Sequence, residues 1–337
     1  MAEQTTIGWP RGITRFEQRH GNATMRIVTG ILGIPVVLGA IWLGGWAFFL
    51  MMALISTGAL LEFYWMTEKR GAIPNKALGV AAGLLLSLSF MHGASDLFFL
   101  GIFGTKPTDL AVMLARFALT LGVLLLFAIA TMIDQMFRKE GSPLINNVAT
   151  FAGVTYISLF LSSLIGLRQL FASEIPFRSY VLALQKSPPE EWAAAGNIDT
   201  LGAFTVVAIM VSIWTCDSLA YFAGRAFGRH KLFERISPKK TWEGSLAGVV
   251  GAVGAMVGLQ QWLLPYLTIG DAVIIGLIVG IFGQLGDLAE SHIKRDAGVK
   301  DSSQLIPGHG GVFDRFDSLL FVAPLVYIYL NFIVLTR

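Results

Sequence analysis

Two acidic residues three positions apart, Asp314 and Asp317, stand directly before an apolar segment. This spacing predicts that both carboxylates lie on one side of a helix, in its first turn. Carboxylates so close repel each other unless a cation lies between them, and hard oxygen ligands favour Mg²⁺ or a similar ion. The preceding segment Gly308–Gly311 suits close approach of the backbone to a ligand. The pair is therefore a candidate metal site, the alternative being two acids that complement the helix dipole.

A polar stripe also emerges from an apolar segment at 271–289. Gln284, Asp287, Ser291 and Lys294 fall at i, i+3, i+7 and i+10, which places them on one face of a helix. The stripe brings another carboxylate and a cation to the place where the chain leaves the apolar segment.

Asp217 is a carboxylate within the apolar segment 201–224, where insertion scales give a cost of about 2.5–3.5 kcal/mol for a charged side chain. It therefore needs a partner, which is either a ligand of a site or, alternatively, interfacial water or Arg225. Glu62, in an earlier apolar segment, is expected to pair helices or to form a wall of the site.

A basic segment follows Asp217 and contains Ser237, Pro238, Lys239 and Lys240. Serine followed by proline is typical of a helix start, so a helix is predicted to begin here with its free amide groups beside the two lysines. Such a start attracts an anion, above all phosphate. The alternative is a basic loop that only fixes the orientation of the chain in a membrane.

These segments supply carboxylates, cations and glycine-rich turns, but no Ser/His/Asp or Cys/His set. Cys216 is the only cysteine, which excludes a disulfide framework and a cysteine-based metal cluster. Phosphoryl or nucleotidyl transfer needs this inventory, because metal ions and cations absorb charge while the protein positions the reactants.

Composition and the length of the apolar runs predict the elements that carry these residues. Of the 337 residues, 54% are hydrophobic and only 14% charged, against about 25% charged residues in soluble domains, so the chain is predicted to be a membrane protein. Apolar runs of about 20 residues predict an all-α polytopic fold and exclude a barrel. Nine transmembrane helices are expected, at 27–44, 46–65, 77–91, 110–133, 148–166, 201–224, 245–267, 271–289 and 317–335. The third is short for a crossing helix.

The positions of Lys and Arg predict the orientation. With the N-terminus in the cytoplasm, 19 of the 25 basic residues fall in cytoplasmic segments and five on the other side. This predicts a protein of the cell (inner) membrane whose active site faces the cytoplasm. Residues 1–26 are then a cytoplasmic segment, 27–200 an N-terminal membrane region with a solvated outer loop at 167–200, and 201–337 the catalytic region. The net charge of +3 gives no reason to expect nucleic acid as a partner.

The segment from Ser291 to Asp317 closely resembles the signature of the phosphatidate cytidylyltransferase (CDP-diacylglycerol synthase) family. A companion motif is similar to 237–245, and Asp217 with the residues up to Arg225 also fits. The resemblance covers 205–335 strongly, whereas the first 200 residues agree only in being hydrophobic spans. So many fixed polar residues make the match far more specific than a lone glycine motif.

The resemblance implies the reaction CTP + phosphatidate → CDP-diacylglycerol + pyrophosphate, with Mg²⁺ and a monovalent cation such as K⁺ at a binuclear centre. By position, Asp287 and Asp314 are then metal ligands, Asp317 completes the centre and Lys294 contacts phosphate. The other residues expected to bind substrate are Asp217, Ser237, Lys239, Lys240, Thr241, Glu243, Ser291, Arg295, Lys300, Asp301, His309 and Arg315. The family also implies a homodimer in the lipid bilayer, with a cavity open to cytosol and to lipid.

Two other functions share parts of this pattern. A CTP-dependent polyprenol or phytol kinase needs the same nucleotide and metal but passes a phosphate to an alcohol, and the full signature argues against it. An anion transporter also carries charges within helices, but commonly shows inverted repeats with charges at the midplane of both halves. Here the polar residues gather in one third of the chain.

Overall fold

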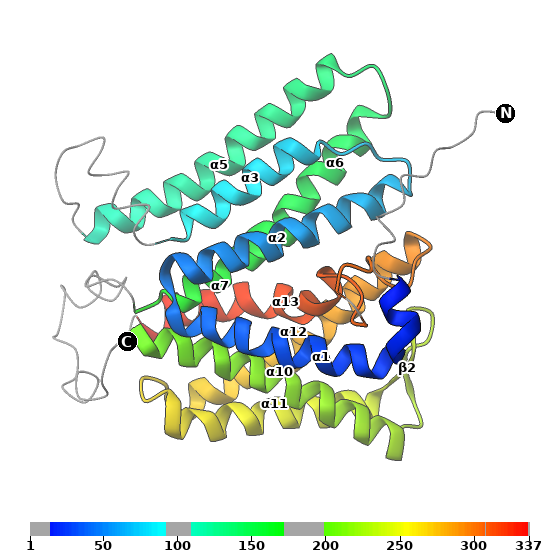
Figure 1. The fold of residues 1–337 in the computed structure, drawn as a ribbon. Coiled ribbons are helices and arrows are strands. Elements are labelled where there is room, and N and C mark those ends of the chain that lie inside the picture. The colour runs from blue at the N-terminus through cyan, green and yellow to red at the C-terminus, as the bar shows by residue number, and fades with distance from the viewer. Residues whose placement is uncertain (1–13, 92–108, 172–198, 307, 336–337) are drawn as a thin grey trace.

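The computed structural model describes residues 14–91, 109–171, 199–306 and 308–335. Nearly all of them are helical, which confirms the predicted all-α class, and the helices lie side by side in one bundle (Figure 1). The elements are α1 (Thr14–Leu43), α2 (Gly45–Glu68), α3 (Lys76–Ser89), α5 (Asp109–Phe137), α6 (Pro143–Gly153), η1 (Val154–Leu159), α7 (Phe160–Arg168), α10 (Asp199–Phe227), β1 (Lys231–Phe233), β2 (Ser237–Thr241), α11 (Trp242–Leu263), α12 (Ile269–Asp296), α13 (Phe313–Tyr329) and η2 (Leu330–Val334).

Among the described residues, seven helical segments are long and apolar enough to cross a membrane. They are Gly45–Glu68, Phe117–Phe137, Pro143–Arg168, Asp199–Phe227, Trp242–Leu263, Ile269–Asp296 and Phe313–Val334. Two shorter apolar helices, Ile27–Leu43 and Lys76–Ser89, coincide with the first and third predicted spans. With 14 residues, α3 is roughly 21 Å long, less than a hydrocarbon core of about 30 Å. The chain is an integral membrane protein with large apolar side chains on its outside, such as Trp262.

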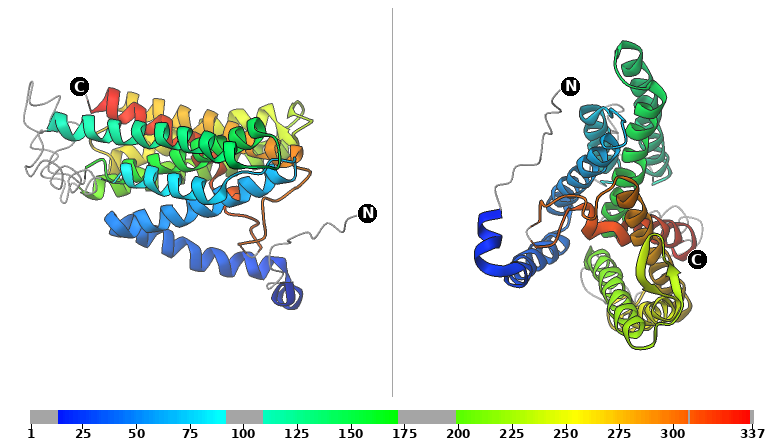
Figure 2. Two further views of the ribbon diagram at one scale, coloured as in Figure 1. Left: turned by 90° about the horizontal axis from the view of Figure 1, so that it is seen from above. Right: turned by 90° about the vertical axis from the view of Figure 1, so that its right-hand side faces the viewer.

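The charged connections gather at one end of the bundle. Figure 1 shows the connections α2–α3, α5–α6, α10–α11 and α12–α13 at the same end, which we call the hairpin end because β1 and β2 lie there. Figure 2 shows the chain between α12 and α13 projecting at this end. Most of the predicted outer loop at 167–200 lies outside the described residues.

Helices α10, α11, α12 and α13 pack against one another in chain order, and α13 also packs on α7 and α2. The contact between α12 and α13 depends on Gly286, because a Cβ there would lie 2.5 Å from the backbone oxygen of Asp317. A helix pair approaches this closely only where one side chain is missing. As a result, Asp287 and Asp317 lie next to each other although they come from different helices.

The helix predicted to begin at Ser237 and Pro238 is wrong. These residues belong to strand β2, which pairs antiparallel with β1 so that Ser237 faces Phe233. Proline is tolerated because this is a two-stranded sheet with free edges. Helix α11 begins only at Trp242, where the Thr241 hydroxyl caps it by accepting from the Gly244 amide at 3.2 Å. Lys239 and Lys240 therefore project from a strand, not from a helix N-terminus.

A π-helical turn, η1, interrupts the long helix formed by α6 and α7. Its Tyr156 packs edge-on against Phe63 of α2 and Phe313 of α13, with ring centroids 6.3 and 6.0 Å apart. Such turns add a residue to a helix and redirect its side chains. This aromatic cluster joins the first half of the chain to the start of α13, the helix that carries Asp314 and Asp317.

Candidate active site

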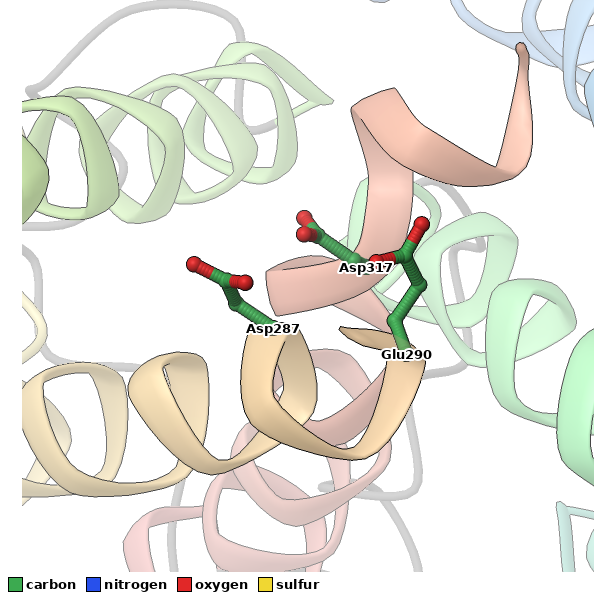
Figure 3. Close-up of side chains that lie close together, drawn as sticks. All are labelled: Asp287, Glu290 and Asp317. Carbon is green, nitrogen blue, oxygen red and sulfur yellow. The ribbon is translucent and has the colours of Figure 1, made fainter. Parts of the chain in front are cut away.

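Three carboxylates converge at the hairpin end of α12 and α13. Asp287 and Glu290 come from α12 and Asp317 from α13, and one oxygen of each lies within 4.8 Å of the others (Figure 3). Glu290 is only 1% exposed, and its Oε1 receives no hydrogen bond from the described residues. A buried carboxylate oxygen without a donor is costly unless a cation binds it. The arrangement therefore fits a hard divalent cation, for which oxygen ligands are preferred.

Two lysines contact this group. Lys240 Nζ lies 2.6 Å from Asp287 Oδ2, while Lys294 Nζ lies 2.7 Å from Glu290 Oε2 and 2.8 Å from Asp314 Oδ1. Asp217 lies close enough to Asp287 for their charges to repel each other. Two ammonium groups thus meet more carboxylates than they can neutralise, and the excess negative charge favours bound cations.

Asp314 has a different environment from the three converging acids. Its carboxylate accepts from the backbone amides of Ser302 and Gly311, at 3.1 and 2.8 Å, as well as from Lys294. Asp314 therefore joins Lys294 to the chain that precedes α13. Glu290, which the sequence did not single out, takes the third place beside Asp287 and Asp317.

A cavity of about 550 Å³, the basic cavity, opens beside the hairpin. Its lining residues are Asp217, Ala220, Tyr221, Gly224, Arg225, Lys231, Leu232, Lys239, Lys240, Thr241, Gly244, Ser245, Gln284 and Asp287. The four cations come from α10, β1 and β2, so the short strands bring basic side chains over the end of α12. Such a surface suits a polyphosphate.

A second cavity of about 490 Å³, the acidic cavity, contains the three converging carboxylates. Its lining residues are Val37, Met210, Ile213, Trp214, Asp217, Asp287, Glu290, Lys294, Asp301, Asp314, Arg315, Phe316, Asp317, Ser318 and Leu319. One wall is apolar and is formed by α1 and α10. Asp217 and Asp287 line both cavities, so the two spaces meet at these carboxylates. The expected alternative partner of Asp217, Arg225, instead donates to Tyr221 at 3.2 Å.

Five of the other predicted substrate residues line a cavity, and a sixth contacts Asp287. Lys239, Lys240 and Thr241 line the basic cavity, and Asp301 and Arg315 the acidic one. Ser291 donates to Asp287 at 3.3 Å.

The remaining five line neither cavity. Ser237 pairs with Phe233 within the hairpin, and Glu243 accepts from His230 Nδ1 at 2.6 Å, which ties the hairpin to α11. Arg295 donates to the Val299 carbonyl, Lys300 is exposed, and His309 donates its backbone amide to Ile306.

The sequence did not indicate Glu290 as part of the site, and it indicated Glu62 without its partners. Glu290 lies three residues after Asp287 and four before Lys294, so helical spacing alone places it beside both. Glu62 was expected to pair helices or form a wall, and it joins α2 to the start of α13 through contacts with residues 302–303 and 312–313, some 240 to 250 positions later in the chain. Its charge within the apolar segment 46–65 was the available signal, but spacing could not supply its partners.

Comparison with known proteins agrees with this geometry. Residues 24–333 match the model of the cytidylyltransferase family. Three relatives are named phosphatidate cytidylyltransferase. The one from Synechocystis sp. is 37% identical over 90% of this chain and 95% of that protein. The one from Bacillus subtilis is 32% identical over 90% of this chain and 95% of that protein, and the one from Brucella abortus is 32% identical over 91% of this chain and 93% of that protein. The family match and these relatives show that this integral membrane protein is a nucleotidyltransferase. The chain belongs to the cytidylyltransferase family.

Proposed function

We propose that this protein transfers the cytidylyl group of CTP to phosphatidate, which yields CDP-diacylglycerol and pyrophosphate. The names of its relatives support the substrates. The single structural observation that carries the proposal is the meeting of a basic cavity and an acidic, partly apolar cavity at Asp217 and Asp287. One substrate of this reaction is a soluble polyanion and the other a membrane lipid, so a site with two unlike chambers suits both.

The residues have separate roles in this proposal. The triphosphate of CTP lies in the basic cavity, where the cations Arg225, Lys231, Lys239 and Lys240 balance its charge. The phosphate of the lipid enters the acidic cavity near Lys294 and Arg315. Its acyl chains leave along the apolar wall, which includes Met210 and Trp214 of α10.

The chemistry needs positioning more than proton transfer. A phosphate oxygen of phosphatidate forms a bond to the α-phosphorus of CTP, and the bond from that phosphorus to the bridging oxygen of the β-phosphate breaks. The bridging oxygen leaves with its electron pair as part of pyrophosphate. Because the attacking oxygen is already ionised, no strong general base is required. Lys239 and Lys240 stabilise the negative charge that grows on the leaving group.

The residues present fit a divalent cation, and Mg²⁺ is the ion we propose. Asp287, Glu290 and Asp317 would hold it, while Asp314 belongs to the centre through Lys294. When bound, the ion supplies Lewis-acid stabilisation of phosphate oxygens. The excess of carboxylates over lysines leaves charge for a monovalent cation such as K⁺ as well.

The protein lies in the cell (inner) membrane, and its hairpin end faces the cytoplasm. The basic residues of the connections at this end support that orientation, because basic loops resist translocation. The catalytic region is residues 201–337, to which α2 of the preceding region adds Glu62. A homodimer rests on the family resemblance, and the mass of the purified protein–detergent complex tests it.

The reaction is tested with purified protein in detergent, given phosphatidate, Mg²⁺ and either CTP, dCTP or ATP. We expect pyrophosphate and liponucleotide in equal amounts, and turnover with CTP or dCTP far above that with ATP. Equal rates with ATP, or a phosphorylated lipid without pyrophosphate, would contradict the proposal and favour a kinase.

A further inference from the structure

Glu62 is a fully buried carboxylate whose partners all come from the other end of the chain. It lies in the second half of α2 with no exposed surface. Glu62 Oε1 accepts from Ser303 Oγ at 2.5 Å and from the Val312 amide at 2.9 Å. Oε2 accepts from Ser302 Oγ at 2.7 Å and from the Phe313 amide at 2.8 Å. No described cation contacts it.

These four contacts define what the carboxylate does. Backbone amides can only donate, and Ser303 Oγ already accepts from the Leu305 amide at 3.1 Å, so its own proton points to Glu62. Val312 and Phe313 form the start of α13, which has no side-chain cap of its own. A negative charge at this position satisfies two otherwise free amides and complements the helix dipole. Glu62 therefore caps α13 from another helix.

The local packing around these contacts is tight. A Cβ added at Gly311 would collide with Ser302 Oγ and with the Glu62 carboxylate, so the backbone passes directly over both. On the same helix as Glu62, Gly58 lies against Val312, with a Cβ there only 3.3 Å from a Val312 methyl group.

From Glu62 a continuous chain of contacts leads to the converging carboxylates. Ser302, held by Glu62 through its hydroxyl, donates its amide to Asp314 at 3.1 Å. Asp314 in turn holds Lys294 at 2.8 Å, and Lys294 contacts Glu290 at 2.7 Å. Every link is a hydrogen bond or ion pair between partly or fully buried groups, where such contacts are strongest.

We propose that Glu62 is a positioning residue for nucleotidyl transfer: without touching substrate, it fixes residues 302–303 and 312–313 and thereby sets Asp314 and Lys294. This rests on the proposed function of the site. Within the signature segment, Asp314 pairs with Lys294, Asp317 belongs to the converging group, and Asp296 pairs with Arg70 at the surface.

The test compares Glu62→Gln with Glu68→Gln, a second acid of α2 that pairs with Lys76 away from the site. Glutamine keeps the shape, but its NH₂ group must face one of the two backbone amides, so one donor of the α13 start loses its acceptor. Turnover and KM are measured with saturating Mg²⁺. A reporter, Gln304→Cys in a Cys216→Ser background, measures thiol labelling next to Ser303.

We expect Glu62→Gln to lower kcat on the order of 100-fold, as a misplacement of about 1 Å commonly does. The KM for CTP should change less than about threefold, because uniform substrate binding is retained in the basic cavity. Labelling at Gln304→Cys should become faster, whereas Glu68→Gln should match the unmodified protein in all three measurements. Ser302→Ala and Ser303→Ala, which keep the carboxylate, should show the same pattern with smaller losses.

Ser302→Ala also keeps the test valid if Glu62→Gln does not fold. A wild-type kcat in Glu62→Gln, or in both serine variants, would overturn the proposal, as would a lower kcat with unchanged labelling of Gln304→Cys. Asp317→Asn is assayed in parallel. If Asp317→Asn also retains turnover, the site assignment itself is wrong, whereas a loss confined to Asp317→Asn refutes only the role of Glu62.

Discussion

Asp287 contacts both the hairpin and its own helix, and its carboxylate reaches both cavities of the site. Its Oδ2 accepts from Lys240 of the hairpin, its Oδ1 accepts from Ser291 one turn along α12, and it lines both cavities. A side chain with these contacts can hold a cation between a nucleotide and a lipid phosphate. A residue that only complements a helix dipole would not need these contacts.

The first prediction separates these two roles. If Asp287 only complemented charge, Asp287→Asn would cost about 0.3–1 kcal/mol of stability and leave activity largely intact. If it holds a cation, the loss of one anionic ligand displaces the α-phosphate. We then expect turnover to fall at least about 100-fold while the protein still inserts and purifies normally.

The matched control is Asp296→Asn, a change of the same type at the end of the same helix. Asp296 is more than half exposed and pairs with Arg70, at 2.5 Å. Exposed ion pairs contribute little to stability because water screens them, so this variant should retain its activity. Both are measured at saturating CTP across a Mg²⁺ titration. Near-wild-type rates for Asp287→Asn would remove Asp287 from the cation site.

At the same scale, the sequence grouped Asp287, Asp314 and Asp317 as one candidate metal centre, whereas the structure brings Asp287 and Asp317 together with Glu290 and pairs Asp314 with Lys294. The sequence indicated Glu62 as a helix-pairing or wall residue but could not name its partners, which depend on how α2 packs against α13. Contacts between segments 240 positions apart are a property of tertiary packing, and neither periodicity nor capping rules contain them.

Among the elements, the α12–α13 pair controls the distance between the carboxylates. The pair is close because Gly286 has no side chain where the Asp317 backbone passes. The second prediction follows. Gly286→Ala would place a Cβ 2.5 Å from the Asp317 oxygen, so α13 must move away and the separation of Asp287 and Asp317 must grow. We expect turnover to fall at least about tenfold.

Gly283, one turn earlier on α12, provides the comparison. A Cβ there would meet nothing closer than 3.6 Å, which is ordinary van der Waals contact, so Gly283→Ala should keep both activity and thermal stability in detergent. Alanine also favours the helix by about 1 kcal/mol over glycine at both positions. Equal activity of the two variants would show that the approach at Gly286 does not set the site geometry.

The elements also show where sequence reasoning stops. Among the described residues, seven of the nine predicted spans coincide with helices long and apolar enough to cross a membrane and the other two with shorter apolar helices, because length and hydropathy are local properties. The hairpin was missed. Ser237 and Pro238 carry a helix-start signal, but pairing with β1 and the cap supplied by Thr241 place the start of α11 later. A short strand pair is stabilised by its surroundings, here α10 and α11, and its sequence carries little signal of its own.

For the whole molecule, function depends on which side of the membrane the hairpin end faces. The basic cavity, the residues that Glu62 holds and the basic connections are all at that end. CTP and pyrophosphate are charged and do not cross lipid, so the proposed function requires the hairpin end to face the compartment that holds nucleotides. The positive-inside rule gives the same orientation independently.

The last prediction tests this orientation with single cysteines in a Cys216→Ser background. Glu234→Cys and Gln304→Cys lie on exposed positions of the hairpin end, and Gly270→Cys lies at the opposite end, at the start of α12. A membrane-impermeant maleimide should label Gly270→Cys in intact cells and the other two only in inverted vesicles. Helices α11 and α12 each span 22 residues or more, about 33 Å or longer, so the two sets of probes cannot share a side if both helices cross. Labelling of Gly270→Cys together with Glu234→Cys would show that α11 does not cross, whereas a full exchange of the two patterns would reverse the orientation and exclude a cytoplasmic source of CTP.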